Sequence, residues 1–343
     1  MQNTTKYVSA EEALKLVQSN TRVFLQGSAA TPVHLINKMF EQKERLQQVE
    51  LVSITQQGVD MNDPSLAGHF FMNSLFVSES NRKAVNSGMG DYVPVFLSEI
   101  PLLFKRDILP IDVAIVHVSP PDKHGYCSLG TSVDITRSAV LTAKKVIAQV
   151  NPNMPRVHGD AFVHFDKFDA AVWVEDDLPE VSYADGFSEI TDKIGKIVAG
   201  LVDDGATLQL GIGTIPDSVL KNLTNHKNLG IHTEMFSDGV IPLINDGTIN
   251  NSQKKIVNGY CVTSFMLGTR KLYDFADDNP IIKALELNYV NDPRVLCLNP
   301  KVTAINSAIE IDLTGQVCSD SIGAYQYSGI GGQMDFIRGA ALS

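Results

Sequence analysis

The sequence predicts an α/β protein built from two similar open-sheet domains that meet at a cleft. Three observations lead to this prediction. The chain has 343 residues, which at ~150 residues per domain suggests two domains. Apolar runs alternate with helical segments, and one strand–turn–helix pattern occurs in both halves. Because 44% of the residues are hydrophobic, a chain of this length can bury a large core.

The first half begins with a predicted helix and continues with predicted strands. Residues 9–18 open with a serine in the N-cap position, and two glutamates stand in the first turn. A short apolar run then leads through a turn at Gly27 to an amphipathic helix from about Pro32. The runs 48–54 and 112–119 are rich in β-branched residues, which is typical of parallel strands that are covered on both faces.

The pattern restarts after a change in composition. Residues 138–150 predict a helix followed by a strand, and residues 151–190 are rich in proline, turns and acidic side chains. A new helix is predicted over 188–202. We therefore divide the chain into an N-terminal α/β domain, residues 1–185, and a C-terminal α/β domain, residues 186–343.

A short internal repeat supports this division. In each half a predicted strand is followed by a glycine, four residues, a proline and a helix: Gly27 to Pro32, and Gly211 to Pro216. Proline in the first turn of a helix loses no hydrogen bond, because that N–H has no partner within the helix. Halves built alike usually share a cleft, although any α/β protein contains turns of this kind.

The turn Gly211-Ile212-Gly213 is a candidate anion site. It lies between a predicted strand and a predicted helix, so its backbone N–H groups stabilise a phosphate or a developing oxyanion. It also resembles the start of a dinucleotide-binding fingerprint, which has an acidic residue about 20 positions further on, here Glu234. The third glycine of that fingerprint is Pro216 in this chain, so dinucleotide binding is the weaker interpretation.

Glu234 is the candidate nucleophile. It follows a predicted strand at 229–232, and the carboxyl ends of strands in open α/β sheets are where ligands bind. A carboxylate there can attack an activated carbonyl and become acylated. The alternative is a solvated loop glutamate, but His232, Thr233 and Ser237 make this segment polar. No third ligand accompanies His232 and Glu234, so we predict no metal site.

A third glycine-rich stretch lies near the end of the sequence. Gly329, Gly331 and Gly332 precede the start of an apolar helix, a pattern that forms a nest of backbone donors. A flexible loop explains the same pattern equally well.

Composition excludes several classes of protein. With 28 Lys and Arg against 39 Asp and Glu, the net charge is −11, and nucleic-acid binding depends mainly on neutralising phosphates. No signal-peptide pattern is present at the start, and the apolar run 92–104 is broken by two prolines. The four cysteines have no metal-site or redox spacing. We expect a cytoplasmic protein that binds neither nucleic acid nor a membrane.

Long stretches of the sequence resemble the acetyl-CoA hydrolase/transferase family, the family I-type CoA-transferases. The resemblance extends over nearly the whole chain. Its main segments are GDYVPVFLSEIPLLF (90–104), VHVSPPDKHGYCSLGTS (116–132), LQLGIGTIPDSVL (208–220), LGIHTEMFSDGV (229–240), NGYCVTSFMLGTRKLYDFADDNP (258–280) and VCSDSIGAYQYSGIGGQMDFIRGA (317–340). The resemblance implies the CoA-transferase (NagB/RpiA-like) fold. It also implies a further segment after the last motif, so the C-terminal domain is expected to be incomplete here.

The resemblance assigns roles to residues. It implies that Glu234 is the nucleophile and that oxyanion donors are the backbone N–H of Ile212, in the turn with Gly213, and that of Gly331 or Gly332. Asn291 is a weaker assignment for the same oxyanion and CoA site. Candidate substrate contacts in the first domain are Gly27 and His124, although an ordinary loop histidine explains His124 as well.

The resemblance implies an activity as well. It implies transfer of CoA between an acyl-CoA and a short-chain carboxylate, of the 4-hydroxybutyrate, butyrate or acetate type, by a ping-pong route through a glutamyl-CoA thioester. No permanently bound cofactor is expected, because CoA and acyl-CoA serve as substrates, and a homodimer or tetramer is implied. Two alternatives remain: hydrolysis of acyl-CoA at the same site, and a non-enzymatic module that binds anions.

Overall fold

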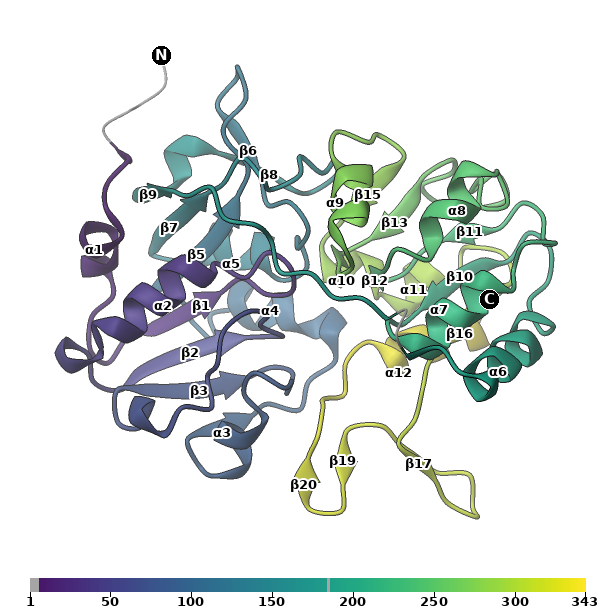
Figure 1. Cartoon of the computed structure of the whole chain (residues 1–343), viewed down its shortest axis with the longest axis horizontal. Coiled ribbons are helices and arrows are strands. Elements are labelled where there is room, and N and C mark those ends of the chain that lie inside the picture. The colour runs from purple at the N-terminus through teal and green to yellow at the C-terminus, as the bar shows by residue number, and fades with distance from the viewer. Residues whose placement is uncertain (1–5, 184–185) are drawn as a thin grey trace.

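The computed structural model describes residues 6–183 and 186–343, and it shows two α/β halves side by side (Figure 1). The first half is a seven-stranded, wholly parallel sheet with the order β4-β3-β2-β1-β5-β7-β9. Its strands are β1 (Arg22–Leu25), β2 (Val49–Ser53), β3 (Phe70–Ser74), β4 (Gly90–Tyr92), β5 (Val113–Val118), β7 (Lys145–Val150) and β9 (Ala170–Trp173). The predicted strands over 48–54 and 112–119 are therefore confirmed.

Both faces of this sheet are buried, which explains the continuous apolar runs. Val113 and Ile115 of β5 belong to a core cluster that also contains residues of the first two helices. Ala114 and Val116, which alternate with them, belong to the main core on the other face. The helices of this half are α1 (Ala10–Ala13), α2 (Val33–Glu41), α3 (Arg82–Asn86), α4 (Ile100–Lys105) and α5 (Thr136–Thr142).

The predicted helix over 9–18 is shorter in the structure. Ser9 caps α1 as expected, because its side chain accepts a hydrogen bond from the Glu12 amide, but the chain continues as a 3₁₀ turn, Leu14–Leu16. Val17 is already extended and fully buried. Packing against the sheet, rather than helix propensity, fixes where such a short helix ends.

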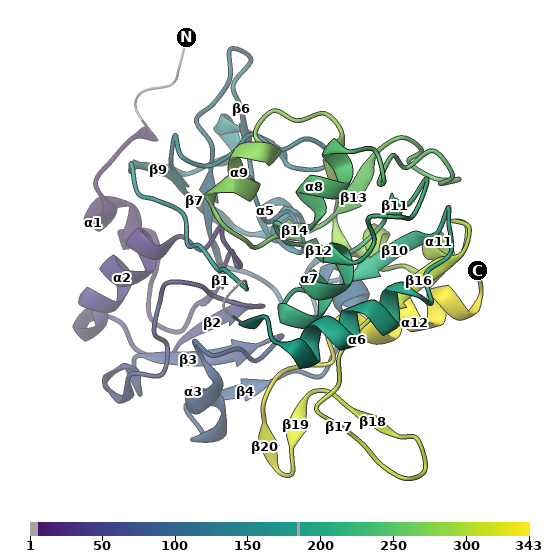
Figure 2. The same cartoon turned by 45° about the vertical axis from the view of Figure 1, so that its right-hand side comes forward.

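The second half contains a smaller parallel sheet with the order β11-β10-β16. Its strands are β10 (Thr207–Leu210), β11 (Gly230–Ile231) and β16 (Val302–Ile305), and the pairs β12 (Met235–Phe236) with β14 (Phe265–Met266) and β13 (Cys261–Thr263) with β15 (Ile282–Ala284) are also parallel. The helix α6 packs on α7, and α12 packs on α11 and β16 (Figure 2). The helices are α6 (Glu189–Ala199), α7 (Thr214–Lys221), α8 (Val240–Asn245), α9 (Arg270–Ala276), α10 (Leu287–Val290), α11 (Pro293–Leu296) and α12 (Gln333–Ala341).

The internal repeat is present in both halves, with one difference. In the first copy α2 begins after Pro32, which occupies the N-cap position. In the second copy α7 begins at Thr214, so Pro216 is its third residue. Both positions precede the first amide that needs a partner within the helix, so neither proline breaks a helical hydrogen bond.

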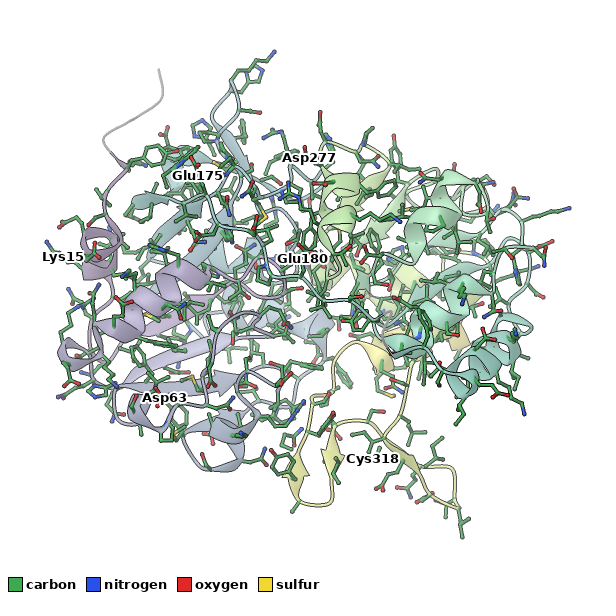
Figure 3. All side chains as sticks on the ribbon, in the orientation of Figure 1. Lys15, Asp63, Glu175, Glu180, Asp277 and Cys318 are labelled. Carbon is green, nitrogen blue, oxygen red and sulfur yellow. The ribbon has the colours of Figure 1, made fainter. Side chains whose placement is uncertain are left out.

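The two halves share one continuous hydrophobic core and several hydrogen bonds. The Ser28 hydroxyl donates to the Met266 carbonyl at 3.3 Å, and the Val133 amide donates to the Ser264 carbonyl at 3.0 Å. The segment that connects the two halves is also hydrogen-bonded to the second half. Glu180, labelled in Figure 3, accepts a hydrogen bond from the Arg270 amide at 2.8 Å. The predicted boundary after residue 185 falls on a position outside the described residues.

A protruding arm joins the second half to the first. It consists of two antiparallel hairpins, β17 (Glu310–Ile311) with β18 (Val317–Cys318) and β19 (Ser321–Ile322) with β20 (Tyr325–Gln326). The arm extends below the two halves in Figure 1 and reaches α3, where Asn86 donates to the Gln326 carbonyl at 2.9 Å. The chain thus contacts the first half immediately before the glycine-rich stretch.

One further strand pair lies in the first half, β6 (Tyr126–Ser128) with β8 (Phe162–His164). No helix in the described ranges is long and apolar enough to cross a bilayer.

Candidate active site

Glu234 lies in the loop between β11 and β12, and backbone contacts on both sides hold this loop. Its carbonyl accepts the amides of Ser264 and Phe265, both at 2.9 Å. The preceding residue, Thr233, donates its hydroxyl to the Leu210 carbonyl at 2.9 Å, at the end of β10. The loop therefore lies beside the start of the Gly211 turn, as predicted for a residue that follows a strand at the carboxyl edge of the sheet.

The Glu234 carboxylate is buried among residues from distant parts of the chain. The side-chain amide of Asn291 donates to its Oε2 atom at 2.7 Å, and the Glu234 residue is only 8% exposed. A Cβ atom at Gly332 would overlap the same Oε2 atom and the amide nitrogen of Asn291. The structure thus brings together Glu234, Asn291 and Gly332, three of the residues predicted for the site.

This environment changes the protonation of the Glu234 carboxyl group. The pKa of Glu234 is raised to about 7, mainly by burial and partly by the negative charge of Asp335, while the hydrogen bond from Asn291 acts in the opposite direction. The ionised carboxylate is poorly solvated, so it is a stronger nucleophile than a carboxylate in water. A carboxyl group with this pKa still ionises readily above neutral pH.

The buried charge is expected to cost stability. Because the pKa is raised from 4.5 to about 7, the folded protein binds more protons than the unfolded chain between these values, and stability falls as pH rises through that window. At pH 8 the cost reaches about 3 kcal/mol. We expect Glu234→Gln to raise the melting temperature at pH 8, measured by thermal denaturation, with a gain that disappears below pH 4.5. An equal melting temperature at pH 8 would contradict this account.

Two glycine turns contain the backbone amides that were predicted as donors. Gly213, at the N-cap of α7, has φ 125°, a conformation that favours glycine. Within the described part of the chain, the N–H groups of Ile212 and Gly332 donate to no protein acceptor. Gly331 has φ +62°, and its carbonyl accepts the Leu97 amide at 3.2 Å. Both predicted donor amides therefore remain available for a ligand.

The first half holds the glycine-rich stretch in place. The Tyr92 hydroxyl accepts the amide of Ile330 at 2.7 Å, and a Cβ atom at Gly329 would lie 2.9 Å from the Phe76 ring. Ser98 donates to Asp335 from its hydroxyl, at 2.8 Å, and from its amide, at 3.2 Å. Sequence reasoning missed these residues, because partners about 240 positions apart leave no local signal.

His232 is a second omission from the predicted site. Its Nε2 atom bonds the carbonyl of Val290 at 2.9 Å, and its Nδ1 atom lies 3.4 Å from the Asn299 amide nitrogen. Burial lowers the pKa of His232 to about 3, so the ring is neutral and its Nε2–H is the donor to Val290. His232 thereby ties the loop of Glu234 to the residue before Asn291.

Two predicted substrate contacts are not brought to the carboxylate. Gly27 is buried and packs closely against the backbone at Thr55, since a Cβ atom there would overlap the Thr55 carbonyl oxygen. His124 lies in an exposed turn, where its amide bonds Asp122 at 2.9 Å. The nearby Cys127 is fully buried, and burial raises the pKa of its thiol to about 12, so the thiol stays protonated at neutral pH.

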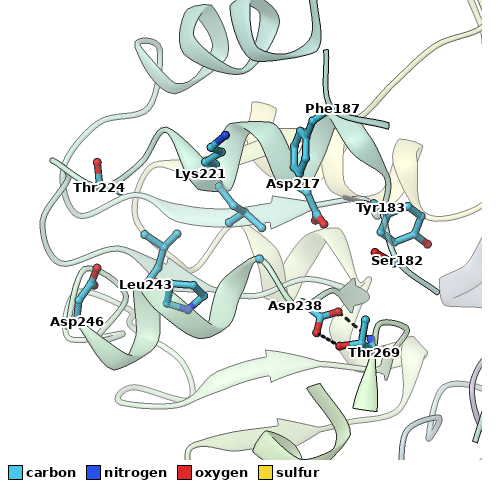
Figure 4. A pocket seen from close by; sticks show the side chains of 13 residues that line it. Ser182, Tyr183, Phe187, Asp217, Lys221, Thr224, Asp238, Leu243, Asp246 and Thr269 are labelled. Atoms are coloured by element: carbon cyan, nitrogen blue, oxygen red, sulfur yellow. Dashed lines mark hydrogen bonds between the residues drawn. The ribbon is translucent and has the colours of Figure 1, made fainter. Parts of the chain in front are cut away.

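Two hollows lie near these elements. A hollow of about 460 Å³ between α7 and α8 is lined by Asp217, Lys221 and Asp238, whose carboxylate accepts the amide and hydroxyl of Thr269 (Figure 4). Glu234 does not line it. A cavity of about 420 Å³ is lined by Asp335 and therefore adjoins the carboxylate site. The described residues contain no group of three or more His, Cys, Asp or Glu that could hold a metal ion.

Known proteins with similar sequences and structures place this chain in a family. Residues 1–184 match the acetyl-CoA hydrolase/transferase N-terminal domain, and residues 268–343 match the corresponding C-terminal domain. A succinyl-CoA:acetate/propanoyl-CoA:succinate CoA transferase of Fasciola hepatica is 50% identical over 98% of this chain and 70% of its own length. A 4-hydroxybutyrate coenzyme A transferase of Clostridium kluyveri is 47% identical over 98% of this chain and 79% of its own.

The fold agrees with these sequence matches. The crystal structure of a 4-hydroxybutyrate CoA-transferase from Porphyromonas gingivalis has a TM-score of 0.82 and 35% identity, and the match covers 99% of this chain and 79% of that one. The predicted α/β class and the predicted family are confirmed. The chain belongs to the acetyl-CoA hydrolase/transferase family.

Proposed function

We propose that the protein is a CoA-transferase that moves CoA between an acyl-CoA and a short-chain carboxylate through covalent intermediates on Glu234. One observation supports this most directly: the Glu234 carboxylate is buried, bonded by Asn291 and in contact with the backbone of Gly332. The names of its relatives support the same reaction class, since they transfer CoA between carboxylic acids.

The proposed reaction has two half-reactions. The Glu234 carboxylate attacks the thioester carbonyl, the C–S bond breaks, and an acyl-glutamyl anhydride and the CoA thiolate form. The thiolate then attacks the glutamyl carbonyl, which releases the first carboxylate and leaves a glutamyl-CoA thioester. A second carboxylate reverses these steps and leaves as its CoA ester. Every step moves an acyl group between oxygen and sulfur, so electrons and atoms balance without a redox partner.

The free amides of the two glycine turns can donate hydrogen bonds to the oxyanions of the proposed transition states. We assign the N–H groups of Ile212 and Gly332 to the oxyanion that forms when Glu234 attacks. One donor of this kind typically contributes ~3 kcal/mol. Because a carboxylate is a weak nucleophile, binding energy from the rest of CoA must also bring the two groups together.

The finer assignments rest on the family resemblance. We propose 4-hydroxybutyrate, butyrate, propionate or acetate as the carboxylates, which differ by contacts of ~1–3 kcal/mol each. We also propose domains at 1–185 and 186–343, a cytoplasmic location and a homodimer or tetramer. Light scattering of the purified protein would test the last of these.

The decisive experiment compares acceptors. The protein is incubated with a panel of acyl-CoA donors, with and without acetate, and free CoA and acetyl-CoA are measured. A transferase forms acetyl-CoA only when acetate is present. Release of CoA at the same rate with and without added carboxylate identifies a hydrolase instead and contradicts our proposal. Absence of any turnover with every donor would favour an anion-binding module.

A further inference from the structure

A second buried carboxyl group lies beside the nucleophile. Asp335, the third residue of α12, is only 3% exposed, although it carries a charge at neutral pH in most proteins. Ser98 donates two hydrogen bonds to it, one to each carboxyl oxygen. The side-chain amide of Asn291 donates to Glu234 at 2.7 Å, and it lies close enough to Asp335 to lower the pKa of that carboxyl group as well. One amide group therefore lies near both carboxyl groups.

No salt bridge neutralises either carboxyl group of this pair within the described residues. Glu99, Asp292, Arg294 and Arg338 line the same cavity as Asp335. Arg294 is already paired with Asp292, at 2.7 Å, and neither Glu234 nor Asp335 has an ion pair. The pKa of Asp335 is raised to about 6, mainly by burial and partly by the charge of Glu99, while the bonds from Ser98 act in the opposite direction. Asp335 is thus ionised at pH 8.

The charge on Glu234 changes during the reaction proposed above. In the first half-reaction an ionised carboxylate becomes an uncharged anhydride and then an uncharged thioester, and the negative charge leaves with the released carboxylate. Two like charges that share a buried site repel each other strongly. Acylation of Glu234 removes this repulsion, whereas deacylation restores it.

We propose that Asp335 is a positioning residue whose negative charge, held by Ser98, favours the acylated form of Glu234 and so increases the amount of enzyme–CoA thioester. This inference rests on the proposed function, because it needs the covalent intermediate. The same repulsion opposes ionisation of Glu234. Removing the Asp335 charge is therefore expected to have two linked effects. It should make the Glu234 carboxyl group ionise at lower pH, and it should decrease the fraction of enzyme in which Glu234 is acylated.

The test compares Asp335→Asn with two other variants. Asp335→Glu keeps the negative charge at this position. Glu99→Gln removes a negative charge from an exposed residue that lines the same cavity and acts on Asp335 rather than on Glu234. Each enzyme is mixed with acyl-CoA and free carboxylate at a fixed ratio at pH 8. Borohydride then reduces the glutamyl-CoA thioester to an alcohol, and peptide mass spectrometry measures the modified fraction. The pH profile of kcat/KM is recorded in parallel.

We expect the equilibrium constant for thioester formation to fall ~10-fold in Asp335→Asn, and the acid limb of its profile to move ~1 pH unit lower, since one pKa unit is a factor of ten. Asp335→Glu should restore both quantities towards wild type, and Glu99→Gln should change neither. A merely structural loss would lower the rate without moving the acid limb.

Two results would overturn the inference, and both differ from failure of the proposed function. Equal thioester fractions and equal acid limbs in wild type and Asp335→Asn would show that the charge is without effect. If Asp335→Asn does not fold, Asp335→Ser, which also removes the charge, takes its place, and an unchanged thioester fraction there also contradicts the inference. A wild-type enzyme that forms no covalent species would instead refute the function itself.

Discussion

Glu234→Gln is expected to lower the rate of CoA transfer by ~10⁴-fold or more, since the loss of a covalent nucleophile removes the whole pathway. The amide keeps nearly the shape of the carboxylate, so it can remain beside Asn291 and Gly332, but its oxygen is a far poorer nucleophile. Steady-state kinetics with acyl-CoA and acetate measure the loss. Borohydride treatment with acyl-CoA alone should label the Glu234 peptide of the wild-type protein and leave that of the variant unlabelled.

A matched control separates this effect from any general damage. Glu175, labelled in Figure 3, is exposed and lies outside the site, so Glu175→Gln makes the same chemical change elsewhere. We expect it to keep wild-type rates and wild-type labelling. Glu234→Gln with substantial transferase activity would exclude the covalent route. Labelling of another glutamate in the wild-type protein would assign the nucleophile elsewhere.

Gly332→Ala is expected to abolish most of the activity through a single methyl group. The backbone at Gly332 has φ −100° and ψ −3°, which alanine adopts without strain. The cost comes from space, because the new Cβ atom would overlap Oε2 of Glu234 and the amide nitrogen of Asn291. The carboxylate must move away from its donors, and a misplacement of ~1 Å costs on the order of 10²-fold in rate. Kinetics should show kcat falling more than KM rises.

Gly200→Ala is the control for the glycine substitution. Gly200 ends α6 with φ −65°, and a Cβ atom there would make only ordinary contacts. Replacing glycine in such a position stabilises a protein by ~0.4–1 kcal/mol through the unfolded state. We expect full activity from Gly200→Ala and a large loss from Gly332→Ala, with both proteins folded by circular dichroism. Equal activities would mean that the carboxylate tolerates the crowding.

The sequence by itself determined the fold class and indicated a candidate nucleophile. Continuous β-branched runs predict strands buried on both faces, and β2 and β5 are such strands because helices cover the sheet on each side. Glu234 was predicted from its place after a strand beside a glycine turn. Both inferences depend on local spacing, which the order of residues fixes. The family resemblance added the roles of Asn291 and Gly332, which spacing could not supply.

Only the tertiary structure decided what surrounds the Glu234 carboxylate. Tyr92 bonds Ile330 in the glycine-rich stretch and Ser98 bonds Asp335 in α12, although about 240 residues separate each from its partner. The second charge at Asp335 was present in a recognised motif, yet no pattern indicated that it would be buried beside Glu234. Such contacts depend on how the two halves dock and on the register of several strand pairs. The sequence encodes that docking only through the sum of many weak interactions, so it cannot be read from any one segment.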